Sequence, residues 1–364
     1  MRIGVNAIFV NSRHNGTTTF LDGVLPSLIS MGHEIVMYSS SERYAGVQAV
    51  ELRKTPRSLC VGEGASAGLQ RFIWMNSRLR RRLKDDGVDV FFSPNVEGML
   101  SCPVPQIVTV HDLIPLMYPE ECPRQHHYYK WLLPKVLRAS ICAVAVSQHT
   151  RRDVIERFGL QASQVTLVYN GLRQQFFDPE FGSEPEGWSS QAYFLFIGTF
   201  APRKNLETVI RAFAQIHAEV PEKLAVVAYP DRWQQSMQHL AAELGVEDKI
   251  VFYSALRHSE VGYLYRHATA LILLSEYEGF GFPPLEAMAM STPAVVSDTT
   301  ALAEVVGDAA IKHACRDVQQ TALAMSKLSS DRGYRDQLGR VGALRARRFT
   351  WTNSAKQICA ALRA

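Results

Sequence analysis

One segment, residues 275–290, gathers the side chains of this sequence that could do chemistry. It reads SEYEGFGFPPLEAMAM and follows an apolar run. Two acidic residues, Glu278 and Glu286, are separated by seven residues within it, and Gly279 and Gly281 follow the first of them. Carboxylates accept hydrogen bonds from hydroxyl groups, and glycines let backbone N–H groups come close to a ligand. The segment therefore indicates a loop that binds a polar ligand.

The same segment predicts a helix that starts at its two prolines. Phe282 precedes a proline, which disfavours the helical conformation, whereas Pro283 and Pro284 are tolerated in a first helical turn. We therefore expect Glu278 in the loop and Glu286 in the first turn, with separate targets for the two carboxylates. The N-terminal end of a helix attracts anions such as a diphosphate. In the alternative interpretation, Glu286 only complements the helix dipole and the glycines only turn the chain.

A basic pair, Arg203 and Lys204, is the second chemical feature. It follows a predicted strand and Gly198, and it precedes a helix expected to start near Asn205. Two cations beside a helix start can neutralise a diphosphate as it leaves. The alternative is a pair of solvated charges.

The first half of the chain holds two further candidates. The loop 11–19 follows the first predicted strand and contains Gly16-Thr17-Thr18, without the G-x-G-x-x-G spacing of dinucleotide-binding loops. Hydride transfer is therefore disfavoured. His111 follows the apolar strand at 107–110. The alternatives are an ordinary strand-to-helix turn and a hydrogen-bonded structural histidine.

Strands that alternate with helices must position these residues. The apolar and β-branched runs predict strands at 2–10, 34–38, 88–92, 106–110, 143–146, 165–168, 192–197, 223–228, 249–253, 268–274 and 293–296. Helical spacing predicts helices at 19–31 and 206–216, and at 334–364 with a break near 349–353. Strands separated by helices imply parallel sheets with crossover helices.

Residues 173–190 interrupt this alternation with two prolines and two glycines and are the predicted linker. We predict an α/β protein with two Rossmann-like, doubly wound parallel-sheet domains facing across a cleft. The N-terminal domain is expected at 1–172 and the second at 191–348, with a C-terminal helix at 349–364 that packs back on the N-terminal domain. Ligands of such sheets bind beyond the carboxyl ends of the strands.

The composition excludes several classes of protein. The chain has 364 residues, 47% of them hydrophobic, and a formal net charge of +4, so bulk charge gives no argument for nucleic-acid binding. No apolar run approaches the roughly 18 residues of a membrane-spanning helix. The chain opens directly on a strand, and we expect a cytoplasmic location. The six cysteines include no C-x-x-C pair, which disfavours a zinc module and a disulfide scaffold.

Residues 71–84 form a basic stretch with interleaved apolar residues and no acidic one. Such a helix can lie on an anionic bilayer, and Arg71–Lys84 is therefore a candidate for peripheral contact with a membrane at the inner face of the cell. A solvated charged face is the commoner explanation. Residues 126–129, His-His-Tyr-Tyr, could border a binding site, but adjacent histidines point apart and do not favour a metal.

The stretch EGFGFPPLEAMA resembles the E-x7-E signature of the family 4 retaining glycosyltransferases of GT-B fold. Three further blocks resemble this family in its order: VYNG at 168–171, IGTFAPRKNL at 197–206 and EVVGDAA at 304–310. The resemblance covers nearly the whole chain and is strongest over 194–310. The sequence departs from the family at Thr199, where an arginine is common, and at 227–230, where a glycine-rich turn is common. Arg203 is a candidate to supply the missing guanidinium.

The resemblance implies a reaction and a set of site residues. A hexose would move from a nucleotide diphosphate sugar to a saccharide or lipid-linked saccharide acceptor, with retention of configuration and attack from the face of the leaving group. The first domain would bind the acceptor and the second the donor. The implied catalytic residues are His111, Arg203, Lys204 and Glu278. The implied donor-binding residues are Gly16, Thr17, Gly198, Arg203, Lys204, Tyr253, Leu256, Glu278, Gly281, Phe282, Pro283, Leu285 and Glu286.

The resemblance also implies which part of the donor each of these residues binds. Glu286 would bind the ribose hydroxyls, Glu278 and the backbone at 281–282 the sugar, and Arg203 and Lys204 the diphosphate. Residues 251–256 would flank the base, and His111 would contact the donor sugar near the reacting carbon. Fixed cations and a helix N-terminus can supply the electrostatic role of a metal, and the sequence has no D-x-D motif. We therefore expect neither a metal nor a cofactor.

The TFAPRKN block most resembles bacterial mannosyltransferases of surface-polysaccharide assembly, such as that of lipopolysaccharide. GDP-mannose is therefore the first expected donor, by analogy alone. Three alternatives remain: a sugar-nucleotide epimerase or a sugar phosphorylase of the same fold, and an inactive module that binds a nucleotide sugar.

Overall fold

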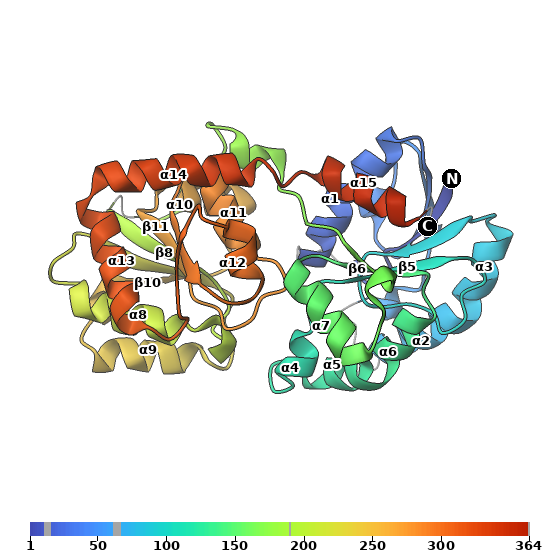
Figure 1. Ribbon diagram of the computed structural model, residues 1–364, viewed down its shortest axis with the longest axis horizontal. Coiled ribbons are helices and arrows are strands. Elements are labelled where there is room, and N and C mark those ends of the chain that lie inside the picture. Colours follow the sequence, from blue (N-terminus) through green and yellow to red (C-terminus); the bar gives the residue numbers. More distant parts are fainter. Residues whose placement is uncertain (11–15, 61–66, 189–190, 363–364) are drawn as a thin grey trace. The chain divides into compact units, whose positions relative to one another are not determined.

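The computed structural model describes residues 1–10, 16–60, 67–188 and 191–362 (Figure 1). The chain divides into two compact units. Unit 1 comprises Met1–Gly171 and Thr350–Ala364, and unit 2 comprises Leu172–Phe349. The predicted linker packs as part of unit 2, because Phe176 is buried there and its ring contacts Tyr265 edge-on with centroids 6.1 Å apart.

Unit 1 is built on a seven-stranded parallel sheet of order β3-β2-β1-β4-β5-β6-β7. Its strands are β1 (Arg2–Asn6), β2 (Glu34–Ser39), β3 (Val50–Lys54), β4 (Val90–Ser93), β5 (Gln106–Val110), β6 (Cys142–Ala145) and β7 (Val165–Leu167). The predicted strand 2–10 is too long, because the chain turns after Asn6 and buries its remaining apolar residues in that turn. Strand β3 was not predicted, because it lies at the sheet edge and its sequence, VELRK, is mostly polar.

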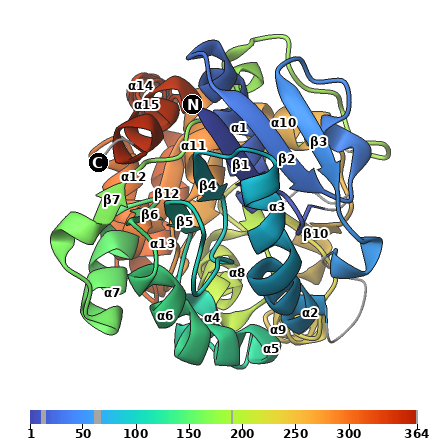
Figure 2. The same cartoon turned by 90° about the vertical axis from the view of Figure 1, so that its right-hand side faces the viewer.

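Helices cover both faces of this sheet (Figure 2). They are α1 (Gly16–Ser30), α2 (Ala67–Trp74), α3 (Arg80–Asp85), α4 (Ile114–Met117), α5 (Pro123–His127), α6 (Leu133–Arg138), α7 (Gln148–Phe158) and α15 (Trp351–Ala361). Helices α1 and α15 pack side by side on one face and the others lie on the opposite face. Gly23 makes the contact between α1 and α15 possible, because a Cβ there would lie 2.1 Å from Trp351 Cε2.

The basic stretch of unit 1 is not one continuous helix. It runs through α2, a π-helical turn at Met75–Leu79 and then α3. Arg71 is buried: its guanidinium pairs with Glu97 at 2.7 Å and donates to the Leu59 carbonyl at 2.9 Å. The prediction that Arg71 belongs to an exposed basic face is therefore wrong, because a partly buried carboxylate partner holds it inside the unit.

Unit 2 is built on a six-stranded parallel sheet of order β10-β9-β8-β11-β12-β13. Its strands are β8 (Tyr193–Gly198), β9 (Lys223–Ala228), β10 (Ile250–Tyr253), β11 (Ala270–Leu273), β12 (Ala294–Ser297) and β13 (Ile311–His313). Its helices are α8 (Leu206–Ile216), α9 (Gln234–Glu243), α10 (His258–His267), α11 (Phe282–Ala289), α12 (Thr300–Val306), α13 (Val318–Ser330) and α14 (Arg332–Ala346).

The strand order of unit 2 reverses direction between β8 and β11. Helices α8, α9 and α13 lie on one face of the sheet, and α10, α11, α12 and α14 lie on the other (Figure 1). The loops that follow β8 and β11 therefore leave the sheet side by side toward opposite faces. This switch point is where ligands bind in open parallel sheets.

The helical region predicted at 334–364 is two helices on either side of the predicted break, and they belong to different units. Helix α14 packs on α11 in unit 2, where a Cβ at Gly339 would lie 2.1 Å from the Ser291 carbonyl oxygen. Helix α15 packs on α1 in unit 1. In the parts of the chain that the structure describes, no helix is both long enough and apolar enough to cross a membrane.

Candidate active site

An ion pair joins the loops that follow the two central strands of unit 2. After β8, a single 3-10 turn at Pro202–Lys204 carries the basic pair. After the neighbouring strand β11, the glycine-rich loop carries Glu278. The Lys204 Nζ and Glu278 Oε1 atoms are 2.5 Å apart, and Arg203 Nη1 lies 3.7 Å from the same oxygen. The structure therefore brings together three residues that the sequence predicted as catalytic.

Arg203 also connects the two loops through other groups. Its Nη1 donates to the Tyr277 carbonyl at 2.7 Å, and its own carbonyl accepts from the Glu276 N–H at 2.8 Å. The Arg203 side chain is 6% exposed, against 13% for Lys204. Arg203 thus holds the loop in position, and Lys204 is the more accessible of the two cations.

Charge keeps Glu278 ionised despite its burial. Burial by itself raises the pKa of the Glu278 carboxyl, but the Lys204 ammonium and the Arg203 guanidinium outweigh it and hold this pKa below its usual value. The cluster therefore carries two positive charges and one negative charge at neutral pH. This net positive charge suits an anionic ligand.

The second acidic residue, Glu286, occupies a different place from the one predicted. Helix α11 begins at Phe282, so Glu286 lies in the second turn and not in the first. The helix starts one residue early because Gly281 takes φ of 112°, a left-handed conformation that turns the chain directly into the helix. A Cβ at position 281 would also lie 2.7 Å from Leu302 Cδ2. Only glycine fits there.

Glu286 and Glu278 have separate partners, as predicted. The Tyr265 hydroxyl, from α10, donates to Glu286 Oε2 at 2.8 Å. Burial raises the pKa of the Glu286 carboxyl to about 7, and the Tyr265 hydrogen bond and the Arg173 charge oppose this rise. The two carboxyl groups of the signature therefore have pKa values shifted in opposite directions, which is a common property of functional sites.

The remaining predicted residues of unit 2 lie on several elements and differ in their contacts and exposure. Gly198 ends β8, and a Cβ there would lie 3.6 Å from Lys204 Cδ. Phe282 and Pro283 open α11 and are partly exposed, whereas Leu285 is fully buried and has no surface to offer a ligand. Tyr253 ends β10, where its ring lies 5.4 Å from that of Trp188, and Leu256 follows in the next loop.

The predicted residues of unit 1 lie at the carboxyl ends of β1 and β5. His111 Nε2 donates to the Pro94 carbonyl at 2.8 Å, and its ring meets Phe20 edge-on at 5.2 Å. Burial lowers the pKa of the His111 imidazole to about 4, so this side chain is neutral at neutral pH. Gly16 and Thr17 form the first turn of α1 and not a loop, and residues 11–15 of the predicted loop lie outside the described residues.

Comparison with protein families matches both units. A model of "Glycosyl transferases group 1" matches residues 181–345, and a model of "Glycosyltransferase Family 4" matches residues 14–175. The two matches occur in the order that the resemblance implies. The chain belongs to the family 4 glycosyltransferases.

Several curated relatives of this chain are mannosyltransferases by name. "O-antigen chain mannosyltransferase RfbU" of Salmonella typhimurium is 27% identical over 62% of this chain and 64% of its own length. "O-antigen chain mannosyltransferase B" of Escherichia coli is 27% identical over 69% of this chain and 68% of its own length. "Serotype-specific mannosyltransferase WbdA" of Escherichia coli is 27% identical over 68% of this chain. The match spans less than two thirds of RfbU and about a third of WbdA.

Solved structures of glycosyltransferases share the fold. A sucrose-phosphate synthase of Thermosynechococcus elongatus matches all of this chain and 98% of its own with a TM-score of 0.77 at 17% identity. WaaG, described as a glycosyltransferase of lipopolysaccharide biosynthesis, matches 99% of this chain and 98% of its own with a TM-score of 0.72 at 16% identity. The two parallel-sheet units are those of a GT-B fold.

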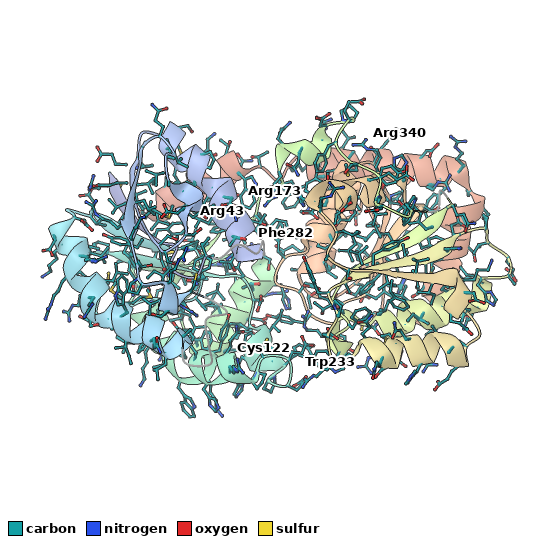
Figure 3. All side chains as sticks on the ribbon, turned by 180° about the vertical axis from the view of Figure 1, so that it is seen from behind. Arg43, Cys122, Arg173, Trp233, Phe282 and Arg340 are labelled. Atoms are coloured by element: carbon teal, nitrogen blue, oxygen red, sulfur yellow. The ribbon has the colours of Figure 1, made fainter. Side chains whose placement is uncertain are left out.

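A hollow of about 480 Å³ lies elsewhere on unit 2, against helices α8 and α9. Its lining includes Phe200, Pro202, Trp233, Glu276 and Arg316, but neither Glu278 nor Glu286. Figure 3 labels Trp233 well away from Phe282 at the start of α11. The turn at 202–204 separates the two places, because Pro202 lines the hollow whereas Lys204 contacts Glu278.

Sequence reasoning missed two contacts of unit 2, one at the site and one that borders the hollow. Tyr265 lies 21 positions before Glu286, in a helix whose spacing carries no signal for this hydrogen bond. The Glu276–Arg316 ion pair, 2.5 Å, joins the loop after β11 to the one after β13. Among the described residues, no cluster of three or more histidine, cysteine or acidic side chains has the arrangement of a metal site.

Proposed function

We propose that this protein transfers a hexose from a nucleoside diphosphate sugar to a saccharide or lipid-linked saccharide acceptor, with retention of configuration at the anomeric carbon. One observation carries the proposal. Two loops at the switch point of unit 2 hold Lys204, Arg203 and Glu278 together, with the start of α11 on the same loop. The cations and the helix N-terminus suit a diphosphate, and the carboxylate suits sugar hydroxyl groups.

The mechanism follows from charge that grows on the departing diphosphate. Lys204 has donor groups beyond the one that contacts Glu278, so its ammonium can bind the diphosphate without losing that partner. Such a contact strengthens as the glycosidic bond breaks and therefore lowers the barrier. Glu278 would orient the sugar while its ring gains positive charge. No step of this mechanism requires a metal or a cofactor.

GDP-mannose is the donor that we propose first. The mannosyltransferase names of relatives at about 27% identity support it, together with the TFAPRKN block. The relatives named for O-antigen chains also support a role in assembling a surface polysaccharide. UDP-glucose is the second donor to test, because a protein of Anabaena with the same fold was solved in complex with UDP-glucose.

The experiment is a donor screen followed by a transfer assay. Thermal shifts with GDP-mannose, UDP-glucose, GDP and UDP identify the nucleotide, because a ligand selective for the native state raises its stability. Radiolabelled sugar is then followed into lipid-extractable or oligosaccharide products. Transfer to an acceptor supports the proposal. Sugar inversion in a donor-only assay would indicate an epimerase, phosphate-dependent cleavage a phosphorylase, and binding without turnover an inactive module.

We also propose that unit 1 contacts an anionic membrane through the exposed part of the basic stretch. Leu69 and Ile73 on α2 are 61% and 56% exposed, and Arg78, Arg80 and Arg81 next to them face solvent. Trp131, also 61% exposed, lies on the π-helical turn Tyr128–Leu132. This turn neighbours α2, because the rings of Phe72 and Tyr128 meet edge-on at 6.2 Å. Exposed apolar residues beside cations are typical of surfaces that bind anionic lipid.

Vesicle sedimentation tests the membrane proposal. The wild-type protein should bind vesicles that contain phosphatidylglycerol and release them at high salt, and a variant with Arg80→Ser and Arg81→Ser should bind them less. The matched control replaces two exposed arginines of unit 2, Arg340→Ser and Arg348→Ser. Equal binding by all three proteins would contradict the assignment of this surface.

A further inference from the structure

Tyr265 contacts both helix α11 and Thr292, which lies between α11 and β12. Its side chain is 1% exposed, and its hydroxyl donates to Glu286 Oε2 at 2.8 Å. Its backbone carbonyl accepts from Thr292 Oγ1 at 2.5 Å, two residues before β12 begins. Its ring is held edge-on against Phe176. These contacts fix both the position of Tyr265 and the direction of its hydroxyl.

The hydroxyl occupies one oxygen of the Glu286 carboxylate and thereby fixes the plane of the group. A carboxylate on a helix can otherwise rotate about its last side-chain torsion, which has broad minima. With Oε2 held by Tyr265, Oε1 is the oxygen whose direction is set for a further donor. A ribose offers two adjacent hydroxyl donors, and each carboxylate oxygen can accept more than one hydrogen bond.

We propose that Tyr265 is a positioning residue for the donor nucleotide, which orients Glu286 so that its carboxylate accepts hydrogen bonds from the two ribose hydroxyls. This inference rests on the proposed function and on the ribose contact that the resemblance to family 4 glycosyltransferases implies for Glu286. Tyr265 itself does not touch the donor. The competing explanation is that Tyr265 only packs α10 against α11.

The electrostatics of the pair give the inference a second readout. The Tyr265 hydrogen bond and the charge of the Arg173 guanidinium both lower the pKa of the Glu286 carboxyl, and burial raises it. Removal of the tyrosine hydroxyl would therefore raise the pKa of Glu286 further above its usual value. Because hydroxyl groups donate best to an ionised carboxylate, ribose binding should then require a higher pH.

The test compares ribose-dependent binding in two variants. Tyr265→Phe keeps the ring and removes only the hydroxyl. Thr292→Val removes the other hydrogen bond of Tyr265 and leaves the hydroxyl on Glu286, so it is the matched control. GDP, UDP, ADP and CDP are titrated calorimetrically into each protein at pH 6, 7 and 8.5, and the nucleotide that binds is compared with its 2′,3′-dideoxy form. Thermal unfolding of each protein reports changes in packing.

The proposal predicts a specific pattern. The wild-type protein should prefer the ribonucleotide, and Tyr265→Phe should reduce this preference about tenfold at pH 7, as expected for one charge-assisted hydrogen bond. The affinity for the dideoxy form should not change, and part of the lost preference should return at pH 8.5. Thr292→Val should lower the unfolding temperature and keep the preference.

Four results would overturn the inference. An unchanged preference in Tyr265→Phe would do so, and so would an equal loss of affinity for both nucleotides, which would indicate a packing role alone. Equal affinity of the wild-type protein for the ribonucleotide and the dideoxynucleotide would show that Glu286 does not bind the ribose hydroxyls. If none of the four diphosphates binds the wild-type protein, the proposed function fails as well, and the inference fails with it.

Discussion

Lys204 and Glu278 form an ion pair of 2.5 Å between loops that leave neighbouring strands, although 73 residues separate them in the chain. Both side chains are nearly buried, with 13% and 12% exposed. The pair thus places the cation proposed to bind the diphosphate beside the carboxylate proposed to bind the sugar. A donor would bring its diphosphate and its sugar to these two groups together.

Replacement of the lysine should damage both stability and turnover. Lys204→Met leaves the Glu278 carboxylate without its nearest cation, and the free energy of unfolding should fall by about 2 kcal/mol, with Arg203 limiting the loss. Urea denaturation measures it. The double variant Lys204→Met, Glu278→Gln should regain stability and remain inactive. A double variant that is as unstable as the single one would contradict the importance of the pair.

Replacement of Glu286 and replacement of Glu278 should change different kinetic constants. Ribose contacts change little as the glycosidic bond breaks, so Glu286→Gln should act mainly on the KM for the donor, by a factor that corresponds to about 1.5–3 kcal/mol. Contacts of Glu278 with the sugar should strengthen in the transition state, so Glu278→Gln should reduce kcat. Steady-state kinetics against the donor decides the point. The reverse pattern would exchange the two roles, and no effect in either variant would remove both residues from the site.

Glu286→Gln should also stabilise the unliganded protein above neutral pH. The folded carboxyl has a pKa of about 7, whereas the unfolded one titrates near 4.3, so the folded state binds the extra proton between these values and loses stability as pH rises through them. The amide does not titrate. The variant should therefore exceed the wild-type free energy of unfolding by up to about 3 kcal/mol at pH 8, with little difference at pH 4. A difference that grows toward low pH would refute the raised pKa.

Gly281→Ala should disturb the start of α11. The residue has φ of 112°, and the new Cβ would lie 2.7 Å from Leu302 Cδ2. Strain and overpacking together should lower the free energy of unfolding by about 2–4 kcal/mol and reduce turnover. Gly245→Ala is the matched control, since Gly245 has φ of 67° with nothing within 4 Å of a Cβ. Thermal unfolding should separate the two variants; equal losses would show that the contact with Leu302 does not matter.

A chelator should leave the reaction unaffected. Arg203, Lys204 and the start of α11 are proposed to stabilise the departing diphosphate, and fixed positive charge can supply this without a metal ion. Initial rates are measured after dialysis against EDTA and again after Mg²⁺ or Mn²⁺ is added. A complete loss of activity that either ion restores would contradict the metal-independent mechanism.

Local patterns in the sequence were enough to predict much of this protein. Parallel strands buried on both faces are apolar runs, and so most strands were found, whereas the edge strands β3 and β13 were not. The spacing of Glu278 and Glu286, the basic pair and their resemblance to the family 4 glycosyltransferases marked the site. The sequence predicts these features because each depends only on residues close together in the chain, such as those at a strand end or a helix start.

Tertiary structure decided which group each side chain contacts. Arg71 belongs to a basic stretch in the sequence, yet a partly buried carboxylate 26 positions away holds it inside unit 1. Tyr265 has no local pattern that would mark it, yet its hydroxyl reaches Glu286 because α10 and α11 pack on the same face of one sheet. Burial, which depends on everything packed around a group, then lowers the pKa of one site residue and raises that of another. Spacing along the chain cannot encode these effects, because they arise from contacts between segments that only the fold brings together.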